Sequence, residues 1–133
     1  MNVLYFAKSA ACAVALSFMT VNAANAFETK AYDAAAFKAA QDAGKPILVD
    51  VFAPWCPTCK AQMKVLETLK SKPDYAALTV FQVDFDTQTD ALKALKVNQQ
   101  STLIAFKGNI ETARSAGATQ PEAIEAVLAS AIK

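Results

Sequence analysis

Histidine is absent from this 133-residue sequence. Its absence removes the usual general base, the Ser–His and Cys–His nucleophile pairs, and the commonest metal ligand. A surplus of either charge is also missing, because 13 Lys and Arg residues face 12 Asp and Glu residues. No run of basic residues interleaved with aromatic residues occurs, so the sequence argues against nucleic acid as a partner.

The sequence also lacks an apolar run of the roughly 20 residues that a membrane-spanning helix needs. The alanine-rich run Ser9–Val21 holds about 13 residues, which is the length typical of a secretory signal peptide. Lys8, just before this run, is the one charged residue among the first 26. These features predict a targeting segment and not a structural part of the fold.

Small residues follow the apolar run and form an Ala24–Ala26 pattern that suits cleavage before Phe27. We therefore expect residues 1–26 to be a signal peptide and residues 27–133 to be the mature domain. Retention of the segment as an N-terminal anchor is the alternative. Export leads to an oxidising compartment in which disulfides persist, and we favour the bacterial periplasm.

Cysteine is scarce, and cleavage would leave only Cys56 and Cys59. A disulfide between residues so close in sequence closes a loop too short to stabilise the fold much, so this pair is expected to be chemically active. A tetrahedral zinc site needs four ligands, usually Cys or His, so we expect no metal and no cofactor beyond the redox disulfide. The alternative is a metal-handling protein in which two chains share their cysteines or the pair binds Cu(I).

The residues around this pair predict a strand, a sharp turn and a helix. Ile47–Ala53 is an apolar run of strand length, Pro54–Trp55 forms a corner, and Pro57–Lys70 has helical spacing. Cys56 would then lie at the amino end of a helix, where free amide groups and the helix dipole favour a thiolate. We expect this thiol to be partly exposed, to have a lowered pKa and to attack substrate disulfides.

The remaining pattern predicts an α/β domain with a central mixed sheet covered by helices on both faces. Within the second helix, Cys59, Met63, Leu66 and Leu69 have the spacing of one buried face. The other expected elements are an edge strand at Glu28–Ala31, a helix at Ala34–Ala43 capped by Asp33 with a Tyr32–Phe37 staple, a strand at Leu78–Phe85, a helix at Ala91–Lys96, a hairpin of Thr102–Lys107 and Ile110–Ser115 around Gly108–Asn109, and a last helix opened by a Thr119–Glu122 capping box around Pro121.

The segment Val49–Lys60, with its Trp-Cys-x-x-Cys-Lys sequence after an acid-bearing strand, resembles the active-site segment of the thioredoxin superfamily. The likeness extends over residues 28–133 and implies a thioredoxin-like fold and a thiol–disulfide oxidoreductase. It implies that Cys56 is the nucleophile and that Cys59 resolves the mixed disulfide. It also maps the family's buried acid onto Asp50, which would shuttle the proton of Cys59.

Two site residues keep an alternative interpretation. Between Val49 and Val51, the Asp50 carboxyl is expected to have its pKa raised by desolvation, as a base working near neutral pH requires. A hydrogen-bonded structural acid is the alternative. Trp55 is expected to cover the cysteine pair, with plain core packing as the alternative.

Pro57 and Thr58 lie between the cysteines and would tune their reactivity. The pair resembles that of periplasmic reductants of cytochrome c maturation, which favours a reductant over an oxidant. The implied partners are protein thiol and disulfide substrates and a membrane redox partner that recycles the dithiol, with the chain acting as a monomer. A thioredoxin-fold binding or chaperone module with little redox turnover is the competing hypothesis.

The sequence departs from the family pattern at three places. The loop that normally carries a cis-proline reads Gln100–Thr102, and Ser101 takes the proline's place. We expect a trans Gln100–Ser101 bond, because a cis bond before a residue other than proline costs about 2.5–4 kcal/mol. The Ser101 hydroxyl either hydrogen-bonds the Cys56 thiolate or marks a tolerated loss that weakens substrate handling.

Gln82 stands where thioredoxins often have a Lys near the buried acid, and Lys64 stands where many have a helix-kinking proline.

Overall fold

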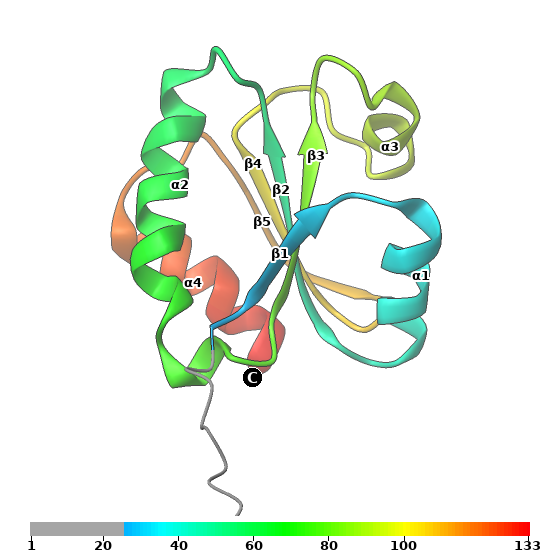
Figure 1. Ribbon diagram of the computed structural model, residues 1–133, viewed down its shortest axis with the longest axis vertical. Coiled ribbons are helices and arrows are strands. Elements are labelled where there is room, and N and C mark those ends of the chain that lie inside the picture. The colour runs from blue at the N-terminus through cyan, green and yellow to red at the C-terminus, as the bar shows by residue number, and fades with distance from the viewer. Residues whose placement is uncertain (1–25) are drawn as a thin grey trace, which may run out of the picture.

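The computed structural model describes residues 26–133, so the predicted signal segment lies outside the described residues except for its last position. A single sheet lies between two pairs of helices (Figure 1). No helix in the described part is both long enough and apolar enough to cross a membrane. The elements are β1 (Glu28–Ala31), α1 (Ala34–Asp42), β2 (Pro46–Phe52), α2 (Pro57–Lys70), the 3-10 turn η1 (Pro73–Tyr75), β3 (Thr79–Asp84), α3 (Thr89–Ala94), β4 (Thr102–Lys107), β5 (Ile110–Ala116) and α4 (Pro121–Ile132).

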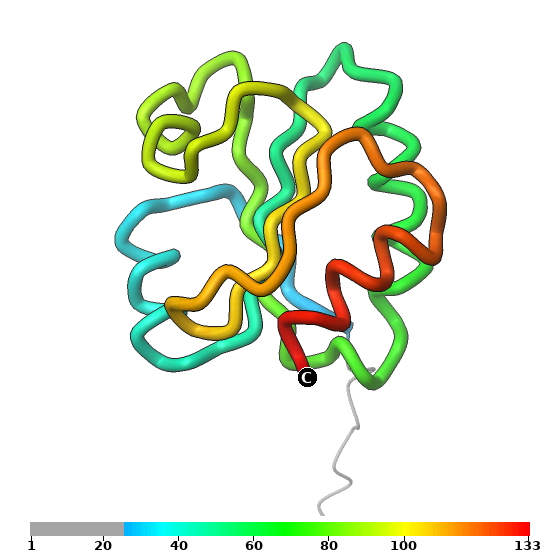
Figure 2. Tube along the Cα trace, turned by 180° about the vertical axis from the view of Figure 1, so that it is seen from behind, coloured from blue at the N-terminus to red at the C-terminus, as the bar shows by residue number. Residues whose placement is uncertain are grey.

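The sheet has five strands in the order β1-β3-β2-β4-β5, with β2 at its centre. Strands β1, β3 and β2 are parallel, whereas β4 is antiparallel to both β2 and β5. Figure 2 shows β4 and β5 from behind as adjacent strands of one hairpin. The predicted mixed sheet, with Glu28–Ala31 at its edge, is confirmed.

Two hydrophobic cores separate the sheet from its two helix layers. Successive strand residues point to opposite faces, so Leu48 belongs to one core and Val49 to the other. The Leu48 core contains residues of α2 and α4, and the Val49 core contains residues of α1 and α3. The predicted apolar stripe of α4 is confirmed and lies in the first core; its residues are Ile124, Val127, Leu128 and Ala131.

The start of α1 forms as its sequence predicts. The Asp33 carboxylate accepts a hydrogen bond from the Ala36 amide at 2.8 Å, which satisfies one of the amide groups left free at a helix start. The rings of Tyr32 and Phe37 lie 5.4 Å apart, one on each side of this cap. This contact is the predicted hydrophobic staple and fixes the direction in which the chain leaves β1.

The turn of the β4–β5 hairpin requires glycine at its first position. Gly108 has a φ of +58°, a backbone conformation that other residues adopt only with strain. A Cβ at this position would also lie 3.2 Å from the Gly44 Cα and 3.3 Å from the Gln41 carbonyl oxygen. Gly108 therefore allows the hairpin to close against the end of α1.

Two helix predictions are wrong in detail. The N-cap of α4 is Gln120, with no side-chain capping bond, because Pro121 occupies the first helical position and leaves Thr119 outside the helix. The predicted Thr119–Glu122 capping box therefore does not form. In α2, Met63 is 43% exposed and Gln62 is fully buried, because the face toward the sheet follows positions 59, 62, 66 and 69.

Candidate active site

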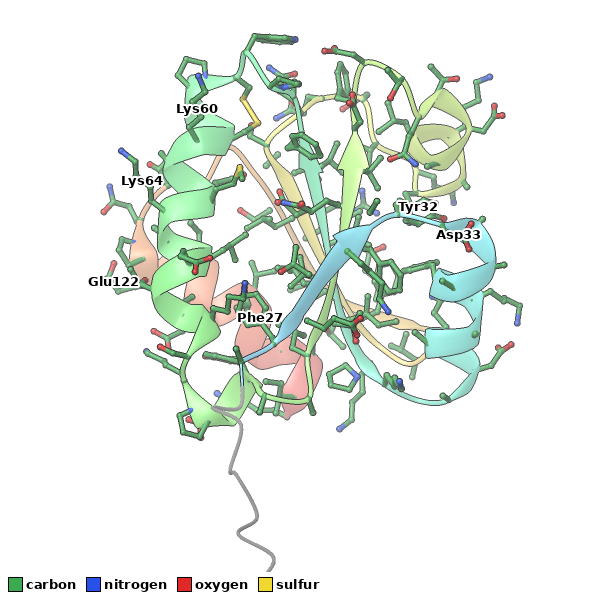
Figure 3. All side chains as sticks on the ribbon, viewed as in Figure 1. Phe27, Tyr32, Asp33, Lys60, Lys64 and Glu122 are labelled. Carbon is green, nitrogen blue, oxygen red and sulfur yellow. A yellow bond between two sulfur atoms is a disulfide. The ribbon has the colours of Figure 1, made fainter. Side chains whose placement is uncertain are left out.

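The two cysteines lie where the central strand passes into α2. Strand β2 ends at Phe52, and Cys56 is the N-cap residue of α2. Cys56 and Cys59 form a disulfide with their Cα atoms 5.3 Å apart, visible as the yellow bond near the start of α2 in Figure 3. The Cys56 sulfur accepts a hydrogen bond from the Cys59 amide at 3.1 Å. An amide aimed at this sulfur would also stabilise a thiolate in the reduced protein.

Cys56 is less accessible than the sequence suggests. The expectation of partial exposure is wrong for this disulfide form, in which Cys56 is 2% exposed and Cys59 is 1% exposed. The Cys56 sulfur is bonded to Cys59 and directed toward the helix start, and the pair packs with Ala53, Phe52 and Phe85. The residues between the cysteines lie nearer the surface, since Pro57 is exposed and Thr58 is half-buried.

Asp50 lies on the face of β2 that is covered by α2, and it is 1% exposed. Burial raises the pKa of its carboxyl group to about 6, and a hydrogen bond donated by Gln82 at 3.2 Å lowers that pKa in part. The predicted direction of the pKa shift is confirmed. Its source differs from the prediction, because the side chains of Val49 and Val51 belong to the core on the opposite face.

The second carboxylate oxygen of Asp50, Oδ1, has no hydrogen-bond partner among residues 26–133. The carboxyl group lines a cavity of about 170 Å³ between α2 and the edge of the sheet. The cavity is lined by Phe27, Thr29, Asp50, Met63, Leu66, Glu67, Lys70, Val80 and Gln82. Its partly polar lining and its size would allow water to reach the acid and exchange a proton with it.

Trp55 is a surface residue, so its interpretation as core packing is wrong. The side chain is 57% exposed, and its indole N–H donates to the Asp86 carboxylate at 2.9 Å. This bond joins the loop before α2 to the loop after β3. It directs the indole N–H toward Asp86, while the proposed covering role stays a prediction.

The loop that contains Ser101 lies at the same end of the sheet as the cysteines, because Thr102 at the start of β4 pairs with Val51 near the end of β2. The Gln100–Ser101 bond is trans, as predicted, since the described residues contain no cis peptide bond. The Ser101 hydroxyl donates to the Gln100 carbonyl at 2.6 Å. In the disulfide form this hydroxyl therefore bonds the backbone, and its bond to the Cys56 thiolate of the reduced protein stays a prediction.

The other two departures from the family pattern have different consequences. Gln82 donates a hydrogen bond to the buried acid and so lowers the pKa of Asp50 in part. Lys64 points to solvent from α2, which runs without interruption from Pro57 to Lys70 (Figure 3). No group of three or more Cys, Asp and Glu side chains in the described part of the chain could hold a metal ion.

One residue of the site escaped the sequence analysis. Gln62 is fully buried, and its side-chain amide donates to the carbonyls of Ser101 at 3.0 Å and Ala118 at 2.8 Å. Its position three residues after Cys59, on the buried face of α2, was a usable signal. Met63 is apolar and also has helical spacing from Cys59, so the sequence pattern favoured Met63 over Gln62 for the buried position.

Comparison with known proteins agrees with this geometry. A family model described as Thioredoxin matches residues 27–130. Thioredoxin-2 of Saccharomyces cerevisiae is 35% identical over 86 residues, which are 65% of this chain and 80% of the yeast protein. The crystal structure of Trxlp from Edwardsiella tarda is 46% identical, covers 75% of this chain and 98% of that chain, and has a TM-score of 0.72.

A longer relative matches over one part only. The bifunctional thioredoxin reductase/thioredoxin of Mycobacterium leprae is 36% identical over 86 residues, which are 65% of this chain. The aligned part is 19% of that protein, so this chain spans less than a fifth of its length.

Proposed function

Because this chain belongs to the thioredoxin family of thiol–disulfide oxidoreductases, we propose that it is an exported enzyme that reduces protein disulfides. The observation that carries the proposal is the Cys56–Cys59 disulfide at the start of α2, with a helix amide directed at the Cys56 sulfur. A cysteine in this position has a stabilised thiolate and a partner within reach.

The proposed reaction begins with the reduced protein. The Cys56 thiolate attacks one sulfur of a substrate disulfide, forms a mixed disulfide and releases the other substrate sulfur as a thiolate. Cys59 then loses its proton and attacks the Cys56 sulfur. The substrate leaves as a dithiol, and the enzyme is left as the Cys56–Cys59 disulfide with two electrons fewer.

Asp50 is the proposed acceptor of the Cys59 proton. A carboxyl group with a pKa of about 6 is largely ionised at neutral pH and still basic enough to take up a proton. Asp50 faces α2 from the central strand, and Cys59 lies on the buried face of α2. The cavity beside Asp50 then offers a route by which the proton leaves to solvent.

The direction of electron flow is proposed from the residues between the cysteines. Pro57 and Thr58 resemble the intervening pair of periplasmic reductants, and no His lies between the cysteines. A reductant in the periplasm needs a supply of two electrons per cycle, for which we propose a membrane redox partner.

We propose that the chain works as a monomer. Residues 1–26 support export by their composition alone.

Insulin reduction tests the enzymatic proposal. The wild-type protein, kept reduced by dithiothreitol, is expected to accelerate insulin reduction, and Cys56→Ser is expected to abolish the acceleration because the attacking sulfur is gone. Thr58→Ser, which keeps both cysteines and a hydroxyl between them, serves as the matched control. Equal rates for wild type and Cys56→Ser would identify a binding or chaperone module instead.

The reduction potential of the Cys56–Cys59 pair tests the direction. A value near −270 mV is expected for a reductant, whereas a value near −120 mV would mark a strong oxidant and contradict the proposed direction.

Fractionation of cells that produce the full chain tests export. Recovery of the processed protein in the periplasm is expected, and recovery in the cytoplasm alone would contradict it.

A further inference from the structure

Gln62 is a buried polar residue that the dithiol reaction does not use. Its side chain is fully buried in α2, three residues after Cys59. A polar side chain without exposure is destabilising unless its groups are hydrogen-bonded, so the contacts of Gln62 show what holds it there. Both amide hydrogens are used, one on the Ser101 carbonyl at 3.0 Å and one on the Ala118 carbonyl at 2.8 Å. The amide oxygen has no hydrogen-bond partner among residues 26–133, so the two donated bonds are what hold the side chain.

These two carbonyls belong to two separate loops. Ser101 ends the loop that leads into β4, and Ala118 lies in the connection between β5 and α4. The Ser101 carbonyl also accepts a hydrogen bond from the Gly117 amide at 2.8 Å. Gln62 and Gly117 therefore tie both loops to each other and to the helix that starts with the cysteine pair.

Apart from these bonds, the Ser101 loop is held by a hydrogen bond from the Thr102 hydroxyl to the Gln99 carbonyl at 2.9 Å and by the burial of Val97 in the Val49 core. Ser101 has a φ of +55°, a conformation that costs a residue with a side chain on the order of 1 kcal/mol. Its hydroxyl bonds only the preceding carbonyl, so it does not anchor the loop to another element. The loop lies at the end of the sheet where the central strand β2 leads to Cys56. A large substrate that reaches this sulfur has to approach past the loop.

We propose that Gln62 is a positioning residue that holds the Ser101 and Ala118 loops against α2 and so sets the surface on which protein disulfides dock. This inference rests on the proposed disulfide reductase function. A small disulfide needs only the Cys56 sulfur, whereas a protein substrate needs the sulfur and the adjacent backbone. Loss of the Gln62 amide thus affects protein substrates selectively.

Steady-state kinetics of Gln62→Met test the proposal, because Met keeps a similar length and removes both donors. The KM for insulin is expected to rise by about fivefold or more while kcat stays the same, and kcat/KM for the small disulfide dithiobis-nitrobenzoate is expected to stay within about twofold. Lys64→Met, an exposed change on the same helix, is the matched control. Equal losses on both substrates, or no change on either, would overturn the role of Gln62.

Gln62→Glu provides a second test that depends on hydrogen-bond donors. An ionised carboxylate has no donor for the two carbonyls, whereas a protonated carboxyl group has one. The insulin KM of Gln62→Glu divided by that of Gln62→Met is therefore expected to be below one at low pH and to rise with pH. A ratio that is constant with pH would contradict the proposal.

Hydrogen exchange gives a readout that does not depend on activity. The Gly117 amide, which bonds the Ser101 carbonyl, is expected to exchange faster in Gln62→Met than in wild type. Unchanged exchange would overturn the inference even if the enzyme is active. A wild-type protein that reduces neither substrate would instead overturn the proposed function, so the two failures are distinguishable.

Discussion

Asp50 shows how a single buried group links stability to chemistry. Its carboxyl group has a pKa of about 6 in the folded protein, because burial disfavours the ionised form more than the Gln82 hydrogen bond favours it. In the unfolded chain the same group would titrate near 3.8. The folded state therefore binds more protons than the unfolded state between these two pH values, and its stability falls as the pH rises through about 6.

Asp50→Asn is expected to separate the two roles of this residue. Asn cannot ionise, so the variant is expected to be more stable than wild type at pH 8 by on the order of 2–3 kcal/mol, with the difference vanishing below about pH 4. The same variant is expected to reduce insulin at least about tenfold more slowly at pH 7, because the proton acceptor is gone. Denaturant unfolding across pH and insulin kinetics measure the two effects.

A stability difference independent of pH would contradict the burial of an ionisable carboxyl group at this position. Unchanged kinetics would leave Asp50 as the hydrogen-bonded structural acid of the alternative interpretation. Asp42→Asn, which changes an exposed carboxylate in α1, is the control for the loss of one negative charge.

Helix starts show how far a local pattern determines an element. Asp33 caps α1 as its sequence predicts, because the cap, the staple and the first turn are all contiguous in the chain. The start of α4 was misassigned because Thr119 and Gln120 both precede Pro121, and only the position of that proline in the first turn decides between them. The result is a helix whose N-cap side chain makes no capping hydrogen bond.

Gln120→Asp is expected to stabilise the protein. An Asp at the N-cap can accept a hydrogen bond from the first turn of α4 and interacts favourably with the helix dipole, for a gain of about 0.5–1 kcal/mol. Thermal or urea unfolding measures the change. Thr119→Asp adds the same charge outside the helix and is expected to give less than half of that gain. A larger effect at Thr119 would restore the capping box as the correct assignment.

The molecule as a whole depends on two cores that the central sheet keeps apart. The core under α2 and α4 contains Leu128, which is fully buried, together with Leu48 of the central strand. The same face of the sheet carries Asp50, so the packing that stabilises the fold also removes water from the acid. Global stability and the raised pKa of Asp50 thus share one cause.

Leu128→Ala is expected to lower the free energy of unfolding by about 2–5 kcal/mol, because it removes buried methyl groups and leaves a cavity under the sheet. Ile110→Ala is the matched control, since Ile110 is 68% exposed and its truncation removes little buried surface. Urea unfolding of both variants measures the difference. Similar losses at the two positions would contradict the assignment of Leu128 to the core.

Sequence patterns were enough to predict the order of the elements, the mixed sheet and the place of Cys56 at the start of α2. These features follow from short-range periodicity, turn residues and caps, which act between residues close in the chain. The direction of the Asp50 pKa shift was also predictable, because a strand that is apolar at both alternating sets of positions is covered on both faces, and an acid within it is desolvated.

Which side chains meet across the sheet and the loops depends on the folded arrangement of the whole chain. The burial of Gln62 in place of Met63 and the hydrogen bond of the exposed Trp55 indole to Asp86 depend on contacts between residues far apart in sequence. Helical spacing tolerates either neighbour on the buried face, and the carbonyls of Ser101 and Ala118 select the one with two donors. Such partners come from other loops, so no local pattern contains them.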